Sequence, residues 1–437
     1  MTTYNSRLAI VCLVAGWAIG CASNAATEQA APTATGAQPM STGVAGSLAA
    51  SAPATSPTPT TTNAAPPSAA APSSMQAVTP PAAAAAAAAS GTQTAAAGPA
   101  DTCVARTVSY SKPCHNDPDP CGIKSGWPGD EYCLLPPKEG EGIQIHIGPA
   151  DYKNMAEIQK YAIKPGEEFD NSVAADIKLT EDKWFQRMTV QMRPGSHHWI
   201  SSVADGKLEP KFYDDTGCNN AMTKGGLGGG QNLIYDNPPG GIPAPENAGL
   251  GRSVPGNSSL CMNLHSYNFT DREQLREIWI NLYFIEEAKI TQKAQGIGLV
   301  GGFGLNLGPH QKKESTYSAK FEGDGRIIQL FGHRHAWTPR FAVWLRDELI
   351  YDSWSWQDSV TFNYDSLSMN PPIRTENKVD GAVSGVVEFK SGDELKFTCF
   401  IENESEKTLG FSNQVYDGEM CNLWGSAVGA GLSGRFR

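Results

Sequence analysis

From Ile143 onward the chain alternates hydrophobic and polar residues over short runs that end at Gly, Pro, Asn or Asp. Alternation with a period of two is typical of a β-strand with one buried face, and regularly spaced runs are typical of sandwiches and barrels. Helical periodicity is scarce. The pattern predicts an all-β fold of antiparallel, jelly-roll-like β-sandwiches. The predicted strands are Ile143–Ile147, Arg187–Met192, Glu277–Phe284, Ile327–Leu330, Arg340–Trp344, Gly385–Phe389 and Glu394–Glu402.

Two glycine-rich stretches interrupt this alternation. Gly225–Gly230 lacks the strand, the helix and the lysine that a phosphate-binding loop requires, so a plain loop is predicted there. Gly296–Gly304 lies midway through the β-rich region. It indicates a boundary between two tandem sandwich domains, residues 101–295 and residues 296–437.

Residues 22–100 have a different composition from the rest of the chain. They are almost wholly Ala, Pro, Ser, Thr and Gly, and Glu28 is their single charged residue. Such a tract has too few large apolar side chains to offset the entropy lost on ordering, which predicts a disordered tether. As a flexible coil it would span roughly 50 Å.

Residues 1–21 are typical of a bacterial export signal. Arg7 precedes the apolar stretch Leu8–Gly20, which is too short for a stable transmembrane helix. The small residues before Cys21 resemble the lipobox of bacterial lipoproteins, although Ala18 stands where Leu is usual. We expect Cys21 to be lipidated and the protein to sit in the cell envelope, at the outer membrane, with the lipid as its one membrane contact. The alternative is a secretory signal that releases a soluble protein.

The charge balance argues against nucleic acid as a partner. The chain has 45 acidic and 34 basic residues, a formal charge of −11. No basic patch that could neutralise phosphates stands out along the sequence. After the N-terminal signal, no apolar run is long enough to span a bilayer.

Eight cysteines remain once Cys12 and Cys21 are assigned to the signal. An even number in an exported chain indicates disulfides. Covalent haem is not indicated, because Ser111 stands where the first cysteine of a Cys-x-x-Cys-His motif belongs, and the paired knuckles of a zinc ribbon are missing. We expect two bridges among the first four cysteines and one in each later pair. The first four are Cys103, Cys114, Cys121 and Cys133, and the later pairs are Cys218 with Cys261 and Cys399 with Cys421.

Four of the eight histidines form two close pairs. His333 and His335 project from the same face of a strand, as two ligands of one metal require. His197 and His198 would point to opposite faces of a regular strand, so binding one ion with both needs a bulge or a strand end. Either pair alone is more often a polar strand surface than a metal site. His115, His146 and His310 lie outside any motif and are interpreted as ordinary polar histidines.

The joint order of these motifs is more specific. His197-His198, then His265, then His333-x-His335, then Met420-Cys421 resembles the copper type II, ascorbate-dependent monooxygenases, the family of the peptidylglycine and dopamine hydroxylases. The resemblance covers about residues 185–425. In that family a half-cystine follows the methionine, and its partner lies in a Gly-Asp-x-Leu-x-x-x-Cys strand, here Gly392–Cys399.

The resemblance implies two coppers per chain and a division of their ligands. His197, His198 and His265 would hold the first copper, and His333, His335 and Met420 the second, where O2 is activated and which therefore supplies the catalytic residues. A thioether is a soft ligand that suits Cu(I) and binds zinc poorly, which favours copper. Ascorbate or a similar one-electron donor would reduce both ions, and a C–H bond of a small molecule or peptide would be hydroxylated.

The sequence also departs from the peptide-hydroxylating branch of the family. Phe331 and Trp424 stand where that branch has an Arg and a Tyr that hold the peptide's carboxylate, so no substrate is assigned. The tryptophans of Asp352–Asp358 are candidates for stacking an aromatic substrate or are simply edge residues. Two other functions stay open: a copper-sequestering lipoprotein without turnover, and a β-sandwich adhesion or ligand-binding module whose metal sites have decayed.

Overall fold

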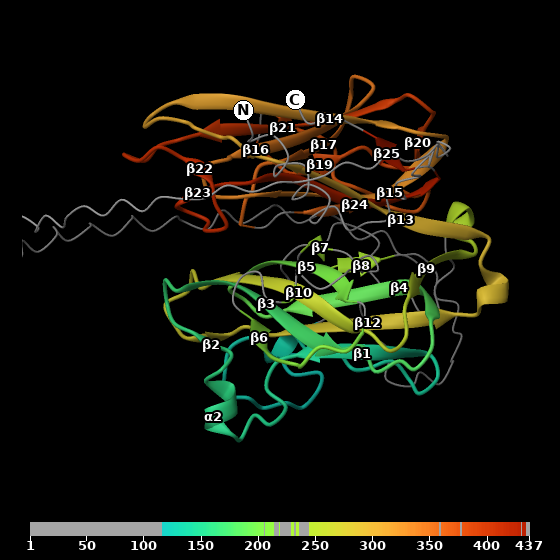
Figure 1. Ribbon diagram of the computed structural model, residues 1–437, viewed down its shortest axis with the longest axis vertical. Coiled ribbons are helices and arrows are strands. Elements are labelled where there is room, and N and C mark those ends of the chain that lie inside the picture. The colour runs from blue at the N-terminus through green and yellow to red at the C-terminus, as the bar shows by residue number, and fades with distance from the viewer. Residues whose placement is uncertain are drawn as a thin grey trace, which may run out of the picture. The chain divides into compact units, whose positions relative to one another are not determined.

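The computed structural model describes residues 116–204, 206–213, 218, 229–230, 233–235, 244–357, 360–375, 378–429 and 431–433. The predicted signal with Cys21, the predicted tether 22–100, and Cys103, Cys114 and His115 lie outside the described residues. Within the described residues strands dominate, which confirms the predicted all-β class (Figure 1). No helix there is long and apolar enough to cross a membrane.

The largest sheet of the described chain has ten strands, and most of its pairings are antiparallel. Eight of them follow one another in the order β1 (Gly142–Ile147), β12 (Ile278–Ile285), β4 (Lys183–Met192), β9 (Leu250–Val254), β13 (Gln292–Gly301), β24 (Cys421–Gly429), β15 (Gly325–Arg334) and β18 (Thr361–Asn363). Off this path, β20 (Val387–Phe389) pairs with β15 and β8 (Leu233–Tyr235) pairs with β4.

Two further sheets supply the other layers. The first has the order β6 (Phe212–Tyr213), β3 (Glu168–Asp176), β10 (Ser259–Tyr267), β5 (Ser196–Ala204) and β7 (Gly229–Gly230). The second has the order β19 (Gly381–Ala382), β17 (Glu348–Ser353), β16 (Arg340–Leu345), β21 (Glu394–Glu402), β14 (Lys312–Phe321) and β25 (Leu432–Ser433).

Short elements complete the described chain. Two small pairs are β2 (Ala162–Ile163) with β11 (Gln274–Leu275), and β22 (Gly410–Phe411) with β23 (Gly418–Glu419). The helical segments are α2 (Met155–Ile158), η1 (Asp130–Tyr132), η2 (Pro245–Asn247) and η3 (Glu287–Lys289). Each run of residues predicted as a strand overlaps one of the strands observed.

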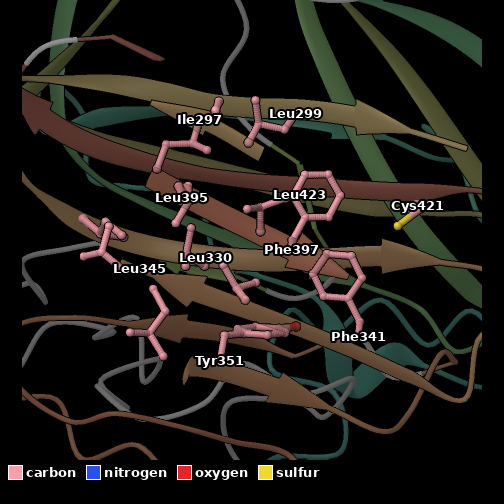
Figure 2. Close-up of a cluster of buried hydrophobic side chains, with 14 of the residues drawn as sticks. Ile297, Leu299, Leu330, Phe341, Leu345, Tyr351, Leu395, Phe397, Cys421 and Leu423 are labelled. Carbon is pink, nitrogen blue, oxygen red and sulfur yellow. The ribbon is translucent and has the colours of Figure 1, made fainter. Parts of the chain in front are cut away.

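Two buried hydrophobic clusters lie between these layers. In the earlier part of the chain, Val190 and Leu282 of the large sheet pack in one cluster with Trp199 and Leu264 of the five-stranded sheet. In the later part, β13, β24 and β15 face the six-stranded sheet, and Figure 2 shows Leu423 and Phe397 among the side chains that meet there. Each cluster is the hydrophobic core between two sheets of a β-sandwich. Strands with alternating apolar and polar residues predict such a core.

The glycine-rich stretch that indicated a domain boundary lies in β13, a continuous strand from Gln292 to Gly301, except for its last three residues. Its first residues pair with β9 and the rest pair with β24, so it links strands of the earlier and later parts. The glycines make room for aromatic rings: a Cβ at Gly298 would lie 2.9 Å from Trp424, and one at Gly301 would lie 2.5 Å from Tyr317. The division into two domains stays a prediction.

Candidate metal centre

Strand β10 presents one histidine on its polar face. Leu260, Met262 and Leu264 point into the hydrophobic cluster. Because side chains alternate across a strand, Asn263 and His265 point to the opposite face. His265 is nevertheless only 1% exposed, so another part of the protein covers that face.

Neighbouring β5 brings two adjacent histidines to the same face through a bulge. His198 pairs with His265, whereas Ser196 pairs with Ser266, which leaves His197 as the extra residue of the bulged strand. The rings of His197 and His198 lie 5.1 Å apart between centroids. A bulge here is what adjacent histidines need in order to serve one ion.

The end of β15 covers this face: His333 lies in the strand, and His335 directly follows its last residue, Arg334. The ring centroids of His333 and His335 lie 5.2 Å apart. Arg334 between them turns to the other side, where its Nη2 donates to Ser353 Oγ at 3.1 Å and its Nε to the Thr338 carbonyl at 3.0 Å. Alternation at the end of β15 therefore separates the two imidazoles from the guanidinium of Arg334.

The two sequence-predicted histidine sets converge on one place. The ring centroid of His333 lies 4.3 Å from that of His198 and 5.4 Å from that of His197. Those of His265 and His335 lie 5.8 Å apart. Two groups of three could hold a metal ion, with ligand atoms within 4.8 Å of one another. These groups are His197 with His265 and His335, and His197 with His198 and His333.

All five rings are at least 97% buried. Burial lowers the pKa of His197, His198 and His333 well below the ordinary value of 6.5, and the neighbouring histidines lower it further. The same causes lower the pKa of His335 to about 3. These four imidazoles are therefore neutral at physiological pH, which is the state that binds a metal.

Polar residues of the same sheet orient two of the rings. His265 Nε2 lies 2.7 Å from Glu168 Oε1, which also accepts the backbone N–H of Val415 at 2.8 Å. His198 Nε2 lies 2.9 Å from Asn263 Oδ1, and Asn263 Nδ2 in turn donates to Asp170. Each contact commits one ring nitrogen and leaves Nδ1 for a ligand, an arrangement common around metal-bound histidine.

The sequence does not single out these supporting side chains. Glu168 lies about 30 residues before His197, the first histidine of the cluster. No sequence motif links it to His265. It is brought there by the register of β3 with β10, in which Asp170 lies opposite His265. Asn263 stands two residues before His265, so strand alternation predicts that both side chains lie on the same face of β10.

The backbone of Met420 lies next to the backbone of His335. Cys421 pairs with Arg334, and Glu419 Oε1 accepts the backbone N–H groups of both His335 and Met420. The Met420 sulfur accepts a hydrogen bond from Asn422 Nδ2 at 3.8 Å. The buried Glu419 carboxylate thus joins the two segments that carry the ligands predicted for the second copper.

An aromatic group borders the histidines. The ring centroid of Trp356 lies 5.8 Å from that of His197, 5.5 Å from that of Phe269 and 5.7 Å from that of Tyr416. Phe269 and Tyr416 are each 42% exposed. Trp354, from the same tryptophan-containing stretch, instead packs with Arg340.

The remaining described histidines lie elsewhere. His146 Nε2 contacts Glu277, a carboxylate that also pairs with Arg193. His310 is exposed and contacts Glu406. Among the described residues, neither belongs to the groups that could hold a metal.

Three disulfides join described cysteines. Cys218 pairs with Cys261 and Cys399 with Cys421, the two later pairs expected from the sequence, and Cys121 pairs with Cys133. Disulfides persist in oxidising compartments, so they indicate an extracellular or periplasmic location.

No family model matches the chain, and no curated protein matches it. Among solved structures, one similarity is to BpGH86A, a β-porphyranase of glycoside hydrolase family 86 from the human gut bacterium Bacteroides plebeius. The sequence identity is 8% and the TM-score 0.15, over 62% of this chain and 36% of that one. The similarity therefore spans little more than a third of the hydrolase and carries no argument about function. The chemistry of this protein has to be inferred from its own buried histidines.

Proposed function

We propose that the chain is a copper-dependent monooxygenase. It would hydroxylate a C–H bond of a small molecule or peptide with O2, taking two electrons from ascorbate or a similar one-electron donor. One oxygen atom enters the product and the other leaves as water. Bound copper supplies the one-electron chemistry and the activation of O2, whereas the chain's residues hold and orient the ions.

The observation that carries the proposal is the convergence of five buried histidines from β5, β10 and the end of β15. Burying so many polar rings costs free energy unless their nitrogens find partners. Within the described residues, neither ring nitrogen of His197 or His333 has a hydrogen-bond partner. A bound metal would satisfy them.

The choice of copper depends on Met420. A thioether next to imidazoles suits Cu(I) and is a poor zinc ligand. Glu419 supports this role because its carboxylate holds the backbone of Met420 next to that of His335. In the proposed assignment His197, His198 and His265 serve one ion, and His333, His335 and Met420 the other.

The proposed substrate is specified only as a compound with a C–H bond that can be hydroxylated. Phe331 and Trp424 lie directly opposite each other in the pairing of β15 with β24, and both are buried. Neither carries a charge that could pair with a carboxylate. We therefore do not propose the peptide carboxylate as the anchoring group of the substrate.

A second function has a specific observation in its favour. The five histidines are at most 3% exposed, which suits a protein that sequesters copper as well as it suits an enzyme. In that case the ligands would be the same and the buried site would slow the release of the metal. The two functions differ in whether bound copper turns over O2.

The deciding experiment measures copper content and O2 uptake on the full chain. A monooxygenase should bind two coppers and consume O2 with ascorbate faster than the same amount of free copper. His335→Ala should abolish this uptake, and His310→Ala, which removes an exposed histidine outside the centre, should leave it unchanged. Copper binding without uptake supports sequestration instead.

The role of Met420 is tested separately by Cu(I) X-ray absorption. The wild-type protein should show a copper–sulfur shell, and Met420→Ala should lose it while keeping the imidazole shell. If the wild type has no sulfur shell, Met420 is not a ligand, and the argument for copper over zinc fails.

We further propose that Cys21 is lipidated and anchors the protein in the outer membrane. Its support is the small-residue sequence before Cys21, together with disulfides that indicate an exported chain. Palmitate labelling that is sensitive to globomycin should depend on Cys21. An unlabelled protein released in soluble form would rule out the anchor.

A further inference from the structure

Aromatic side chains continue the histidine-bearing face of β10 beyond its buried part. Tyr267, the last residue of β10, stands two residues after His265, so alternation places both side chains on the same face. The ring of Phe269 lies against that of Tyr267, with 4.2 Å between centroids. The chain therefore leads from a buried imidazole directly to two aromatic rings.

Two rings from the later part of the chain complete this group. The ring centroid of Trp356 lies 5.5 Å from that of Phe269 and 5.7 Å from that of Tyr416. The centroid of Tyr416 in turn lies 5.5 Å from that of Tyr267. The four rings contact one another in a closed circuit, and Tyr267, Phe269, Trp356 and Tyr416 are called the aromatic cluster below.

The aromatic cluster extends from the histidines to the solvent. Trp356 is its inner member, with its ring beside that of His197, which is 1% exposed. Phe269 and Tyr416 are its outer members and are each 42% exposed. A ligand ring that covers them removes apolar surface from water and can meet them edge-on or offset, the geometries that aromatic rings prefer. The cluster therefore offers a binding surface next to the proposed metal ligands.

The charged side chains next to the histidines are committed to partners within the protein. They are Glu168, Arg334 and Glu419. Both carboxylates accept backbone N–H groups, and Glu168 also contacts a histidine. The guanidinium of Arg334 donates to Ser353 and to a backbone carbonyl on the side away from the histidines. Recognition at this place is thus better supplied by aromatic rings than by an ion pair.

We propose that the aromatic cluster binds an uncharged aromatic group of the substrate. The ligand ring packs on the exposed sides of Phe269 and Tyr416, and Trp356 separates it from His197. That the bound compound is a substrate rests on the proposed function. The preference for an aromatic ring rests on the aromatic cluster alone, so it can be tested without turnover.

The first test is binding of small probes to the full chain, measured by saturation-transfer NMR titration. Benzyl alcohol should bind roughly 2-fold to 10-fold more tightly than its saturated counterpart cyclohexylmethanol, which is the gain expected from an aromatic pair. Benzylamine and benzoate, which carry the same ring and a charge, should bind no more tightly than benzyl alcohol. Equal binding of cyclohexylmethanol overturns the aromatic preference, and tighter binding of either charged probe overturns the uncharged class.

Variants then locate the bound ring. Phe269→Ala and Tyr416→Ala should each weaken the binding of benzyl alcohol, whereas Tyr416→Phe, which keeps the ring, should bind it like the wild type. Phe303→Ala is the matched control, because it removes a ring that is 53% exposed and stacks with Phe411 in a different pair. If Phe269→Ala and Phe303→Ala bind benzyl alcohol equally well, the aromatic cluster is not the binding site.

The outcomes separate this inference from the proposed function. Preferential binding of benzyl alcohol that depends on Phe269, without ascorbate-dependent O2 uptake, supports the aromatic site and contradicts the monooxygenase. Uptake by a chain that does not distinguish benzyl alcohol from cyclohexylmethanol supports the monooxygenase and contradicts the aromatic site. Failure of both measurements contradicts both.

Discussion

His265 and His310 each face a glutamate, but in opposite surroundings. The side chains of His265 and Glu168 are 1% and 12% exposed, with 2.7 Å between Nε2 and Oε1. Those of His310 and Glu406 are 61% and 89% exposed, with 3.1 Å between the same atoms. Water competes for the exposed contact, which contributes little, whereas the largely covered Glu168 carboxylate fixes the orientation of the His265 ring.

Glu168→Gln should therefore weaken copper binding. Loss of the carboxylate loosens the hold on the His265 ring, and changes of this kind typically cost about 10-fold to 100-fold in metal affinity. Competition with a chromophoric Cu(I) chelator measures the affinity. Glu406→Gln is the matched control and should bind copper like the wild type. Equal affinities in the two variants would show that Glu168 does not support the centre.

At the scale of elements, the Cys399–Cys421 disulfide joins two sheets. Cys399 lies in β21 of the six-stranded sheet and Cys421 begins β24 of the large sheet. Both cysteines are fully buried in the later hydrophobic cluster. Since Met420 immediately precedes Cys421, the bridge also fixes the segment that presents the methionine.

Replacing Cys399 and Cys421 with Ala should lower the free energy of unfolding by about 3 kcal/mol, as expected for a bridge that closes a loop of this size in the chain-entropy model. The cysteines are 22 residues apart. Urea unfolding measures the change, and Cu(I) X-ray absorption should show a weaker sulfur shell. Replacing Cys121 and Cys133 is the control, because it removes a disulfide and should leave the sulfur shell intact.

Strand β13 provides a second test at this scale. Gly301→Ala places a methyl group 2.5 Å from the Tyr317 ring, whose hydroxyl oxygen accepts the backbone N–H of Gly302. The ring cannot move away without losing this bond, so we expect a destabilisation of about 1–3 kcal/mol. Gln295→Ala, at an exposed position of β13, should change stability little. Equal urea midpoints for the two variants would contradict the close packing.

For the whole molecule, the cluster of neutral histidines makes metal-free stability depend on pH. The folded state keeps four imidazoles unprotonated to well below pH 6.5, whereas the unfolded chain protonates them near that value. The unfolded state then binds more protons, and stability falls as the pH falls below about 6.5. The four histidines with lowered pKa values are His197, His198, His333 and His335.

Glu419 acts in the opposite direction. Burial raises its pKa from 4.5 to about 7, so between these values the folded state binds the additional proton and stability rises as the pH falls. One such carboxyl offsets about one of the four histidines. The net expectation for the metal-free protein is still a loss of stability on going from pH 7 to pH 5.

Urea unfolding of the metal-free protein at several pH values tests this expectation. Each histidine contributes at most about 1.4 kcal/mol per pH unit below its unfolded pKa. Glu419→Gln should steepen the fall, because it removes the opposing group. A stability that stays level between pH 7 and pH 5 would show that the histidines are not kept neutral by burial.

The all-β class could be read from the sequence because alternation of apolar and polar residues is a local property of each strand. The same local rule placed His333 and His335 on one face and required a bulge at His197 and His198, which β5 provides. The cysteine pairs Cys218–Cys261 and Cys399–Cys421 likewise agree with the sequence-based expectation.

Tertiary structure alone decided what lies around each imidazole. The contact of Glu168 with His265 depends on the register of β3 with β10, and the meeting of His198 with His333 depends on how two sheets pack. Neither contact gives a periodic pattern in the sequence, because each forms between residues that are far apart along the chain. For the same reason, motif order divides the histidines into two sets, while packing brings all five into one buried cluster.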